Sequence, residues 1–336
     1  MTSSAARFES ISVIGGGAWG TALAQTASQS GKRVLLWARE ADVVEDINTR
    51  NVNRTFLAGV PLDPGIRATG NLAEAARSDV ILMVAPAQHL RAVSSAMAKD
   101  LREGHPFVIC SKGIEQASGK LMGEVAEETV PHAIHAVLSG PSFAADVVRG
   151  LPAALTLACR NEDVGRRLAE GLSSRQMRLY WSSDVIGAEL GGSVKNVLAI
   201  AAGIVAGRGL GASAHAALVT RGFAELRRFA EGFGARPETL MGLSGLGDLI
   251  LTCGSPQSRN MSLGRALAEG QTLAQILGSR HAVTEGVYTA AAVVKLAREK
   301  GIEMPISEAV HAIIEGSISV DDAIAGLMQR PLKAED

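Results

Sequence analysis

A lysine and an aspartate in the second half of the sequence form a candidate acid–base pair. Lys195 lies in a strongly apolar segment that continues through Val205, and Asp248 follows the glycine-rich stretch Gly242–Gly247. An unpaired carboxylate in apolar surroundings is costly, so Asp248 needs a partner, and Lys195 is the natural one. The lysine either extends its ammonium to solvent or lies buried with a depressed pKa, where it could act as a general acid.

A second chemical signature, GGGAWG at residues 15–20, follows an apolar run and precedes a helical pattern. In a strand–turn–helix context Gly15 would allow a tight turn, Gly17 would let the backbone approach a pyrophosphate, and Gly20 would permit close packing. The unpaired N–H groups at the start of the new helix favour phosphate. The pattern predicts dinucleotide binding, and the alternative is a glycine-rich turn needed only for packing.

The residue after the second apolar run bears on the choice between NAD and NADP. An acidic residue there favours NAD, whereas this chain continues from Val34–Trp37 into Ala38, Arg39 and Glu40. Arg39 could stack on adenine and pair with a 2′-phosphate, which favours NADP. The adjacent Glu40 weakens that preference, and a solvated surface arginine is the alternative.

Two later apolar runs end in residues that could contact a ligand, because ligands of open α/β sheets bind beyond the carboxyl ends of strands. One run ends at Cys110 and continues to Lys112, which could hold an anionic substrate or be an exposed lysine. The other ends at Leu138 and continues to Ser142, which could contact a ligand or only cap a helix that we expect over Phe143–Val148.

Three polar residues precede a helix that we expect to begin at Leu263. Ser258, Arg259 and Asn260 combine a hydroxyl, a guanidinium and an amide at a helix start. Such a set can bind phosphate through charge-assisted hydrogen bonds and the free N–H groups of the helix. The alternative is a capped helix with a surface arginine.

These residues require a scaffold that positions them. The pattern of the first half of the chain predicts short strands that alternate with helices. The expected strands are Ser12–Ile14, Val34–Trp37, Val80–Val84, Phe107–Cys110, Ala136–Leu138 and Ala154–Leu157. Most are continuously apolar, which is typical of parallel strands buried on both faces. The alternation predicts a doubly wound, Rossmann-like α/β domain.

After about Asp184 the strand-like runs disappear and helical patterns take over. The expected helices are Ile186–Arg208, Ala214–Phe233, Leu263–Ile276 and Thr284–Lys300. We therefore expect a mostly parallel Rossmann-like domain over residues 1–184 and an all-helical domain over residues 185–336.

The composition excludes several classes of protein. The chain has 336 residues, and its 33 Lys and Arg residues nearly balance 34 Asp and Glu residues, which does not support a globally basic nucleic-acid-binding surface. The three cysteines form no Cys-x-x-Cys pair, residues 1–10 lack an apolar signal core, and no run of about 18 apolar residues occurs. The histidines are scattered. We therefore expect a cytoplasmic protein with no membrane span, no nucleic-acid partner and no metal.

Seven segments taken together resemble the bacterial NAD(P)-dependent glycerol-3-phosphate dehydrogenases in order and spacing. They are GGGAWGTALA at 15–24, SKGIE at 111–115, SGPSFA at 139–144, VKNV at 194–197, GLGDL at 245–249, SRN at 258–260 and TEG at 284–286. The resemblance extends over about residues 10 to 325. As a set across both halves of the chain, these motifs are far more specific than the glycine signature alone.

The resemblance implies reversible reduction of dihydroxyacetone phosphate to sn-glycerol 3-phosphate for phospholipid synthesis, with NAD or NADP as cofactor and NADPH slightly favoured. It assigns Lys195 as proton donor and acceptor, oriented by Asp248 and Lys112. The implied substrate contacts are Lys112, Gly140, Ser142, Lys195, Asp248, Ser258, Arg259 and Asn260. The implied cofactor contacts are Gly15, Gly17, Ala18, Trp19, Gly20, Arg39, Lys112, Ala144, Arg259, Val283 and Glu285. Relatives often carry serine in place of Ala18, so one hydroxyl contact to the cofactor is expected to be lost.

Two other functions would explain part of these motifs. A relative that acts on a 3-hydroxy acid would share the two domain types and a working lysine, but the segments 258–260 and 245–248 argue against it. A non-catalytic NAD(P) sensor would bind the cofactor without turnover and would leave Lys195 and Asp248 unexplained. The sequence leaves a homodimer open.

Overall fold

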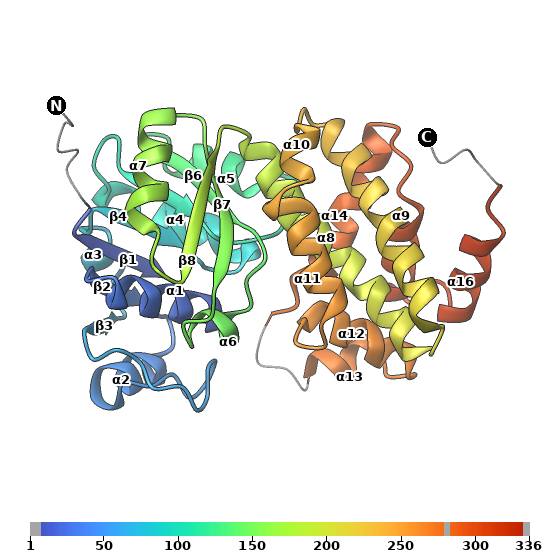
Figure 1. Cartoon of the computed structure of the whole chain (residues 1–336), viewed down its shortest axis with the longest axis horizontal. Coiled ribbons are helices and arrows are strands. Elements are labelled where there is room, and N and C mark those ends of the chain that lie inside the picture. Colours follow the sequence, from blue (N-terminus) through green and yellow to red (C-terminus); the bar gives the residue numbers. More distant parts are fainter. Residues whose placement is uncertain (1–7, 279–282, 332–336) are drawn as a thin grey trace.

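The computed structural model describes residues 8–278 and 283–331, and it places a strand-rich first half beside a helical second half (Figure 1). The predicted fold class is confirmed. The strands are β1 Ser10–Ile14, β2 Arg33–Trp37, β3 Ile66–Thr69, β4 Val80–Met83, β5 Pro106–Ile109, β6 Ile134–Ser139, β7 Ala153–Cys159 and β8 Met177–Ser182. They form one eight-stranded sheet.

The strand order β3-β2-β1-β4-β5-β6-β7-β8 places β1 between β2 and β4. The connections therefore run in opposite directions on either side of the β1–β4 pair, which creates a crevice at the carboxyl ends of these strands. All neighbouring strands are parallel except β6 and β7. The sheet is therefore mostly parallel, as expected, with β7 antiparallel to β6. The connection 140–152 carries only the short helix α6, Ala144–Val147, which packs on α1 instead of crossing the sheet.

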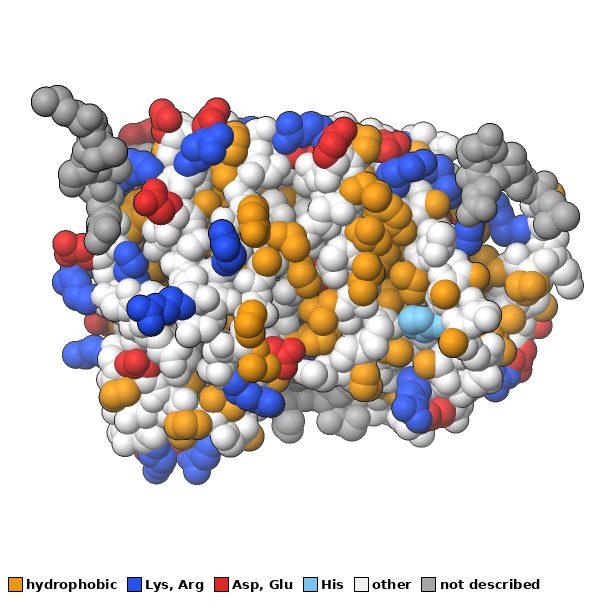
Figure 2. Space-filling view, in the orientation of Figure 1, with side chains coloured by type: hydrophobic (Ala, Val, Ile, Leu, Met, Phe, Trp, Pro, Cys, Tyr) orange, Lys and Arg blue, Asp and Glu red, His pale blue; other side chains and the backbone are white. Residues whose placement is uncertain are grey.

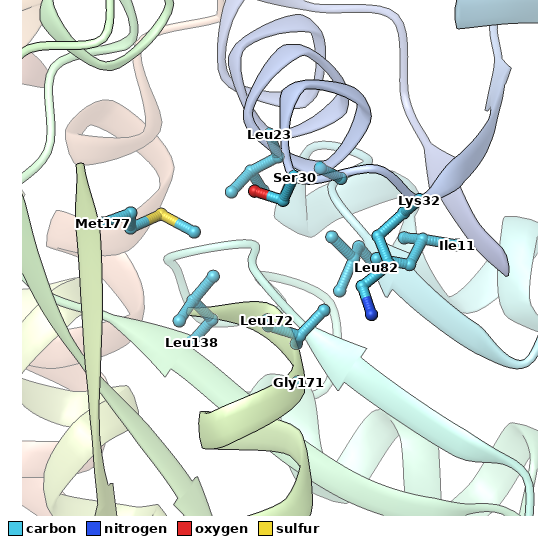
Figure 3. Close-up of a pocket in the computed structure, with 10 residues that line it drawn as sticks. Ile11, Leu23, Ser30, Lys32, Leu82, Leu138, Gly171, Leu172 and Met177 are labelled. Carbon is cyan, nitrogen blue, oxygen red and sulfur yellow. The ribbon is translucent and has the colours of Figure 1, made fainter. Parts of the chain in front are cut away.

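Helices cover both faces of the sheet. The longer ones are α1 Ala18–Gln29, α2 Ala41–Arg50, α4 Leu90–Met97, α5 Met122–Thr129 and α7 Glu162–Leu172, and α3 spans Leu72–Ala75. Figure 3 shows Leu23 of α1, Leu172 of α7 and Leu138 of β6 turned toward one another. The gap left between them is a cavity of ≈ 10 Å³, so this interface is a packed core and not a ligand site.

The second half is built around one long helix, α8, Val185–Gly207. The other helices of this half are α9 Gly211–Glu231, α10 Pro237–Leu240, α11 Asp248–Gly254, α12 Arg259–Ala268, α13 Leu273–Gly278, α14 Glu285–Glu299, α15 Pro305–Ile314 and α16 Val320–Met328. By length and composition α8 could cross a membrane, but 89% of its apolar window is buried inside the fold. It is the core helix against which α9, α11, α12, α14 and α15 pack.

One expected helix differs from the structure, and two strands of the structure were not expected, each for a local reason. The helix expected over Leu263–Ile276 begins earlier and breaks into α12 and α13, because Gly270 between them has a positive φ of 91°. Strands β3 and β8 were not predicted. β3 has only four residues with Arg67 and Thr69 among them, and β8 is an edge strand whose Arg178 and Tyr180 are exposed.

Two glycines let α8 and α12 pack backbone against backbone. A Cβ atom at Gly203 of α8 would lie 1.9 Å from the Met261 carbonyl oxygen, and one at Gly264 of α12 would lie 1.9 Å from the Ile200 carbonyl oxygen. No side chain fits at either position without separating the helices. This close approach places the amino end of α12 beside the middle of α8, where Lys195 lies.

We expect Gly264→Ala to destabilise the protein by about 3 kcal/mol or more, because the added methyl group would overlap the α8 backbone. Gly326 in α16 is the matched control, since no atom lies within 4 Å of the position its Cβ would take. Gly326→Ala should be neutral or stabilising by about 0.5–1 kcal/mol. Urea unfolding of both variants measures the difference, and equal midpoints would contradict the packing described here.

Candidate active site

A buried aspartate lies between two lysines that come from different halves of the chain. Asp248 Oδ1 accepts a hydrogen bond from Lys195 Nζ at 2.6 Å, and Asp248 Oδ2 accepts one from Lys112 Nζ at 2.6 Å. The Asp248 side chain is 1% exposed, that of Lys195 9% and that of Lys112 17%. Lys195 therefore lies buried, and the alternative that it extends its ammonium to solvent was wrong. We call these three residues the lysine–aspartate centre.

Each member of the lysine–aspartate centre is positioned by the end or the middle of a regular element. Lys195 lies near the middle of α8, and Asp248 is the first residue of α11, directly after the π-helical turn Leu243–Gly247. Lys112 follows the end of β5, and its Nζ also donates to the Gly140 carbonyl oxygen at 2.9 Å. Gly140 has a φ of 144°, and a Cβ there would lie 3.0 Å from Leu155 Cα, so the turn after β6 that presents this carbonyl favours glycine.

Burial and charge shift the pKa values of this centre in ways that suit proton transfer. Burial lowers the pKa of Lys195 to about 8, although the neighbouring carboxylate of Asp248 opposes the shift. Burial alone would raise the pKa of Asp248, but the Lys112 and Lys195 ammonium groups outweigh it and lower that pKa. Asp248 therefore stays ionised while Lys195 can exist with or without its proton near neutral pH.

Thr252 belongs to the same cluster and was missed in the sequence. Its Oγ1 accepts from Lys195 Nζ at 2.8 Å and lies 3.2 Å from Asp248 Oδ1. The spacing of four residues from Asp248 would have placed both side chains on one face of a helix, but the sequence shows no clear start for α11. With Asp248 and Thr252 as partners, the direction of the Lys195 ammonium is fixed.

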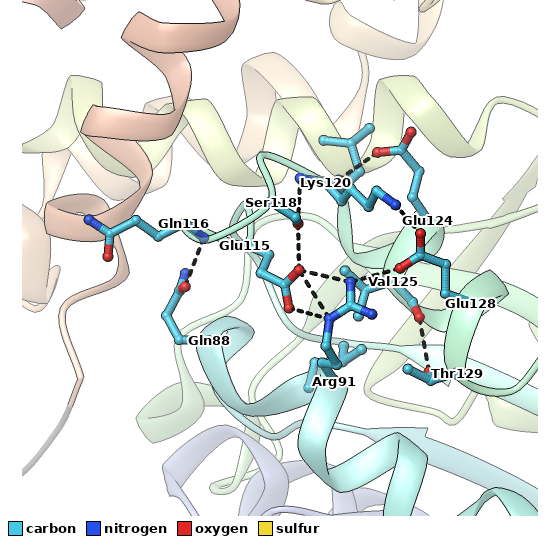
Figure 4. A network of polar contacts seen from close by, with 12 residues as sticks. Gln88, Arg91, Glu115, Gln116, Ser118, Lys120, Glu124, Val125, Glu128 and Thr129 are labelled. Atoms are coloured by element: carbon cyan, nitrogen blue, oxygen red, sulfur yellow. Dashed lines mark hydrogen bonds and ion pairs between the residues drawn. The ribbon is translucent and has the colours of Figure 1, made fainter.

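The loop that follows Lys112 is held by a network of side chains, which Figure 4 shows. Arg91 of α4 binds Glu115 in a bidentate manner, with Nε–Oε1 and Nη2–Oε2 distances of 2.9 Å. Gln88 donates to the Ile114 carbonyl oxygen at 2.8 Å and accepts from the Gln116 backbone N–H at 2.9 Å. Glu115 is 6% exposed. The network holds the loop after Lys112 against α4 and the turn that precedes it.

The glycine-rich loop between β1 and α1 has the geometry expected for a dinucleotide-binding turn. Gly15 has a φ of 131°, and a Cβ there would lie 2.9 Å from the Val84 carbonyl carbon. A Cβ at Gly20 would lie 1.9 Å from the Gly15 carbonyl oxygen, whereas one at Gly17 would meet nothing within 4 Å. Gly15 and Gly20 therefore serve close packing, and the backbone at Gly17 is open to a ligand.

Two buried polar atoms near this loop fit a bound dinucleotide. Ala18 and Trp19 begin α1, and Trp19 Nε1 is buried with no hydrogen-bond partner among residues 8–278 and 283–331. Glu285, the first residue of α14, accepts from the Ala87 backbone N–H just beyond β4 at 3.0 Å, while its Oε2 has no partner in the same ranges. Burial raises the pKa of Glu285. Val283, two residues earlier, is half-buried.

The three residues at the start of α12 occupy different positions. Ser258 is the N-cap, whose side chain accepts from the Met261 backbone N–H at 3.2 Å, and Arg259 is the exposed first residue of the helix. Asn260 is buried, donating to Asn196 Oδ1 at 2.9 Å and accepting from the Gly286 backbone N–H at 3.0 Å. Asn260 therefore ties α12 to α8, next to Lys195, and to the start of α14.

The remaining predicted residues lie along the other strand ends. Ser142 Oγ donates to the Gly140 carbonyl oxygen at 3.1 Å, and the N-cap of α6 is Phe143, so the expectation that Ser142 caps a helix over 143–148 was wrong. Ala144 is the first residue of α6 and half-buried. The Arg39 side chain is 75% exposed and pairs with Glu40 at 3.0 Å. Within the described residues, no group of three His, Cys, Asp or Glu side chains could hold a metal ion.

Comparison with known proteins gives one consistent result. Residues 10–165 match the family model described as NAD-dependent glycerol-3-phosphate dehydrogenase N-terminus, and residues 184–325 match the one described as its C-terminus. The chain is 58% identical to glycerol-3-phosphate dehydrogenase [NAD(P)+] of Parvibaculum lavamentivorans, over 98% of each chain. It is similar to the crystal structure of glycerol-3-phosphate dehydrogenase from Coxiella burnetii, with 37% identity, a TM-score of 0.92 and coverage of 96% of this chain and 99% of that one.

The lysine–aspartate centre makes stability sensitive to Asp248. We expect Asp248→Asn to cost about 3–5 kcal/mol at pH 7, because it leaves two ammonium groups without their counter-ion. The pKa of Lys195 is lowered on folding, so its buried ammonium disfavours the folded state below pH 8, and this cost fades as the pH rises above 8. The loss should therefore shrink at higher pH.

Glu162→Gln provides a control for this variant, since Glu162 pairs with Arg166 at 2.8 Å on an exposed helix face. Its removal should leave stability nearly unchanged. Denaturant unfolding at pH 7 and pH 9.5 measures both variants. An Asp248→Asn protein as stable as the wild type at pH 7 would show that the two ammonium groups do not need the carboxylate.

Proposed function

The chain belongs to the NAD-dependent glycerol-3-phosphate dehydrogenase family, and from this membership we propose that it transfers hydride reversibly between NAD(P)H and dihydroxyacetone phosphate, giving sn-glycerol 3-phosphate. The observation that carries the proposal is the buried Lys195, which has an acidic partner and a pKa of about 8. Full-length identity of 58% to a curated relative of that name supports the same reaction.

The glycine-rich loop and the start of α1 are proposed to hold the pyrophosphate of the cofactor. Gly17 has open space where a side chain would be, and the free N–H groups of α1 favour an anion at this position. The buried Trp19 Nε1 and Glu285 Oε2 are proposed to gain partners from the cofactor. When bound, the reduced nicotinamide supplies the hydride.

Lys195 is proposed to move the proton that accompanies the hydride. As hydride reaches C2 of the ketone, negative charge develops on the carbonyl oxygen, and an ammonium beside that oxygen both stabilises the charge and donates a proton. Asp248 and Thr252 fix the direction of this ammonium, and Lys112, bound to the other oxygen of Asp248, adds a second positive charge. In alcohol oxidation the neutral amine of Lys195 accepts the proton.

The amino end of α12 is proposed to bind the phosphate of the substrate. Arg259 is exposed at the first position of a ten-residue helix, where the N–H groups and the helix dipole also favour an anion. Asn260 ties this end to α8 beside Lys195. Phosphate binding there, with contributions from Ser258, Gly140 and Ser142, would hold C2 of the substrate at a fixed position relative to the ammonium.

Cofactor preference and cellular role follow as finer proposals. Arg39 is proposed to pair with a 2′-phosphate, but Glu40 binds the same guanidinium, so we expect NADPH to be favoured only slightly over NADH. We propose that residues 1–184 and 185–336 fold as two domains, and that the protein is cytoplasmic, supplies phospholipid synthesis and is compatible with a homodimer.

The reaction and the role of Lys195 are tested by following NADPH absorbance at 340 nm with dihydroxyacetone phosphate. We expect turnover by the wild type and a loss of about 10²–10⁴-fold in kcat for Lys195→Met, because the proton donor is gone. NADPH affinity should be nearly unchanged. Lys295→Met, at an exposed position of α14, is the control and should retain full activity. Near-normal kcat in Lys195→Met would exclude Lys195 as the proton donor.

The pH dependence follows from the pKa of about 8 for Lys195. In ketone reduction kcat/KM should fall as the pH rises through about 8, because the ammonium is the active form. In alcohol oxidation it should rise over the same interval, because the neutral amine is the active form. Initial rates from pH 6 to pH 10 in both directions measure the two profiles. Profiles that move in the same direction around pH 8 would contradict acid–base catalysis by this residue.

A further inference from the structure

Asn53, which belongs to none of the seven family-like segments, is completely buried against the glycine-rich loop. It lies in the connection between α2 and β3, more than thirty residues after that loop in the sequence, and is 0% exposed. Burial of an amide side chain is costly unless its donors and acceptor are all satisfied. The partners of Asn53 therefore indicate what the residue does.

Both N–H donors of the Asn53 side chain form hydrogen bonds to the glycine-rich loop and the start of α1. Asn53 Nδ2 donates to the Gly16 carbonyl oxygen at 2.8 Å and to Thr21 Oγ1 at 2.8 Å. Asn53 Oδ1 accepts from the Phe56 backbone N–H at 3.1 Å. Because Phe56 supplies a donor and Gly16 supplies an acceptor, the orientation of the amide is fixed by its surroundings.

Thr21 passes this constraint on to the next peptide of the loop. Its hydroxyl accepts from Asn53 and so has its own proton free to donate to the Gly17 carbonyl oxygen, at 2.9 Å. The Thr21 backbone N–H donates to the same oxygen at 2.9 Å. Two successive carbonyl groups, those of Gly16 and Gly17, are thereby held by donors from the protein.

The direction of these carbonyls matters for an anionic ligand. A carbonyl oxygen turned toward a pyrophosphate would repel it, whereas an N–H would bind it. Glycine has no side chain to hold its own peptide plane, and Gly17 has no neighbour within 4 Å of its Cβ position. The Gly17 carbonyl is held by the Thr21 backbone N–H in the first turn of α1, whereas the Gly16 carbonyl accepts from the side chains of Asn53 and Thr21. The orientation of the Gly16 peptide therefore depends on these side chains.

The segment that carries Asn53 is itself anchored. The neighbouring Arg54 binds Asp46 of α2, with Nε–Oδ2 at 2.8 Å and Nη2–Oδ1 at 2.7 Å, and the Leu57 backbone N–H donates to the Asn53 carbonyl oxygen at 2.9 Å. These contacts hold the Asn53 backbone between α2 and the loop. The amide is thus presented from a fixed support.

We propose that Asn53 is a positioning residue that holds the Gly16 and Gly17 carbonyls away from the cofactor, so that the N–H groups of the loop face the pyrophosphate. This inference rests on the proposed function, since it assumes that the loop binds NAD(P). It assigns Asn53 a role in affinity for the cofactor and none in the proton transfer at Lys195. Because NADH and NADPH share the pyrophosphate, Asn53 serves both equally.

The test is Asn53→Asp, which keeps the shape of the side chain but replaces the two N–H donors with a carboxylate oxygen that faces the Gly16 carbonyl oxygen and cannot donate to it. We expect the Kd and KM for NADPH to rise at least tenfold, the KM for NADH to rise by the same factor, and the KM for dihydroxyacetone phosphate to change little. Lowering the pH should reduce the defect, because a protonated aspartate regains one O–H donor. Fluorescence titration with NADPH gives the Kd without turnover.

Asn48→Asp is the matched control. Asn48 also uses both its donor and its acceptor on backbone groups, donating to the Ala68 carbonyl oxygen and accepting from the Ala68 N–H, both at 2.9 Å, but it supports β3 and not the loop. Its substitution should affect stability and leave the Kd for NADPH unchanged. Thr21→Val, which breaks the second link, should weaken both cofactors as Asn53→Asp does, whereas Thr21→Ser should retain wild-type affinity. These two variants decide the matter if Asn53→Asp does not fold.

The possible results distinguish failure of the proposed function from failure of the positioning role of Asn53. A wild-type protein that binds neither NADPH nor NADH would overturn the proposed function. A wild type that binds NADPH, together with a folded Asn53→Asp or Thr21→Val protein of unchanged Kd, would overturn the positioning role alone. A defect for NADPH but not for NADH would also overturn it, because that pattern belongs to the ribose phosphate and not to the pyrophosphate.

Discussion

The structure of the site depends on one buried carboxylate that is shared by two ammonium groups. Asp248 lies at the amino end of α11, Lys195 in the core helix α8 and Lys112 beyond strand β5. None of the three charges would be stable in this environment alone. Lys195 and Asp248 pair within the helical half, and Lys112 joins the sheet half to the same carboxylate. The charged centre is thus both a contact between the sheet and the helices and the place where proton transfer is proposed.

Much of the fold could be predicted from the sequence because its signals are local. The continuous apolar runs of β4 and β5 predict buried parallel strands, and the glycine pattern at 15–20 predicts the turn between β1 and α1. The direction of β7 depends on where α6 packs, which no local pattern reveals. Strand β8 lies at an exposed sheet edge, so its sequence lacks the apolar continuity of the central strands.

Some residues of the site could likewise be predicted from the sequence, and others could not. Lys195 and Asp248 could be predicted as a pair because a charge in an apolar segment requires a partner. Thr252 and Asn53 could not be found in this way, because hydroxyl and amide groups are common in sequences and become informative only when their partners are known. Both act through hydrogen bonds to elements that lie elsewhere in the chain, Thr252 on Lys195 and Asn53 on Gly16 and Thr21.

The apolar character of α8 also has a consequence for folding during synthesis. During translation its 23 residues leave the ribosome well before α12, α14 and α15, the helices that later enclose it. During that interval the nascent chain exposes a segment that is apolar enough to cross a lipid bilayer and whose only charged residues are Glu189 and Lys195. The helical half can therefore enclose α8 completely only after residues up to α15 have been synthesised.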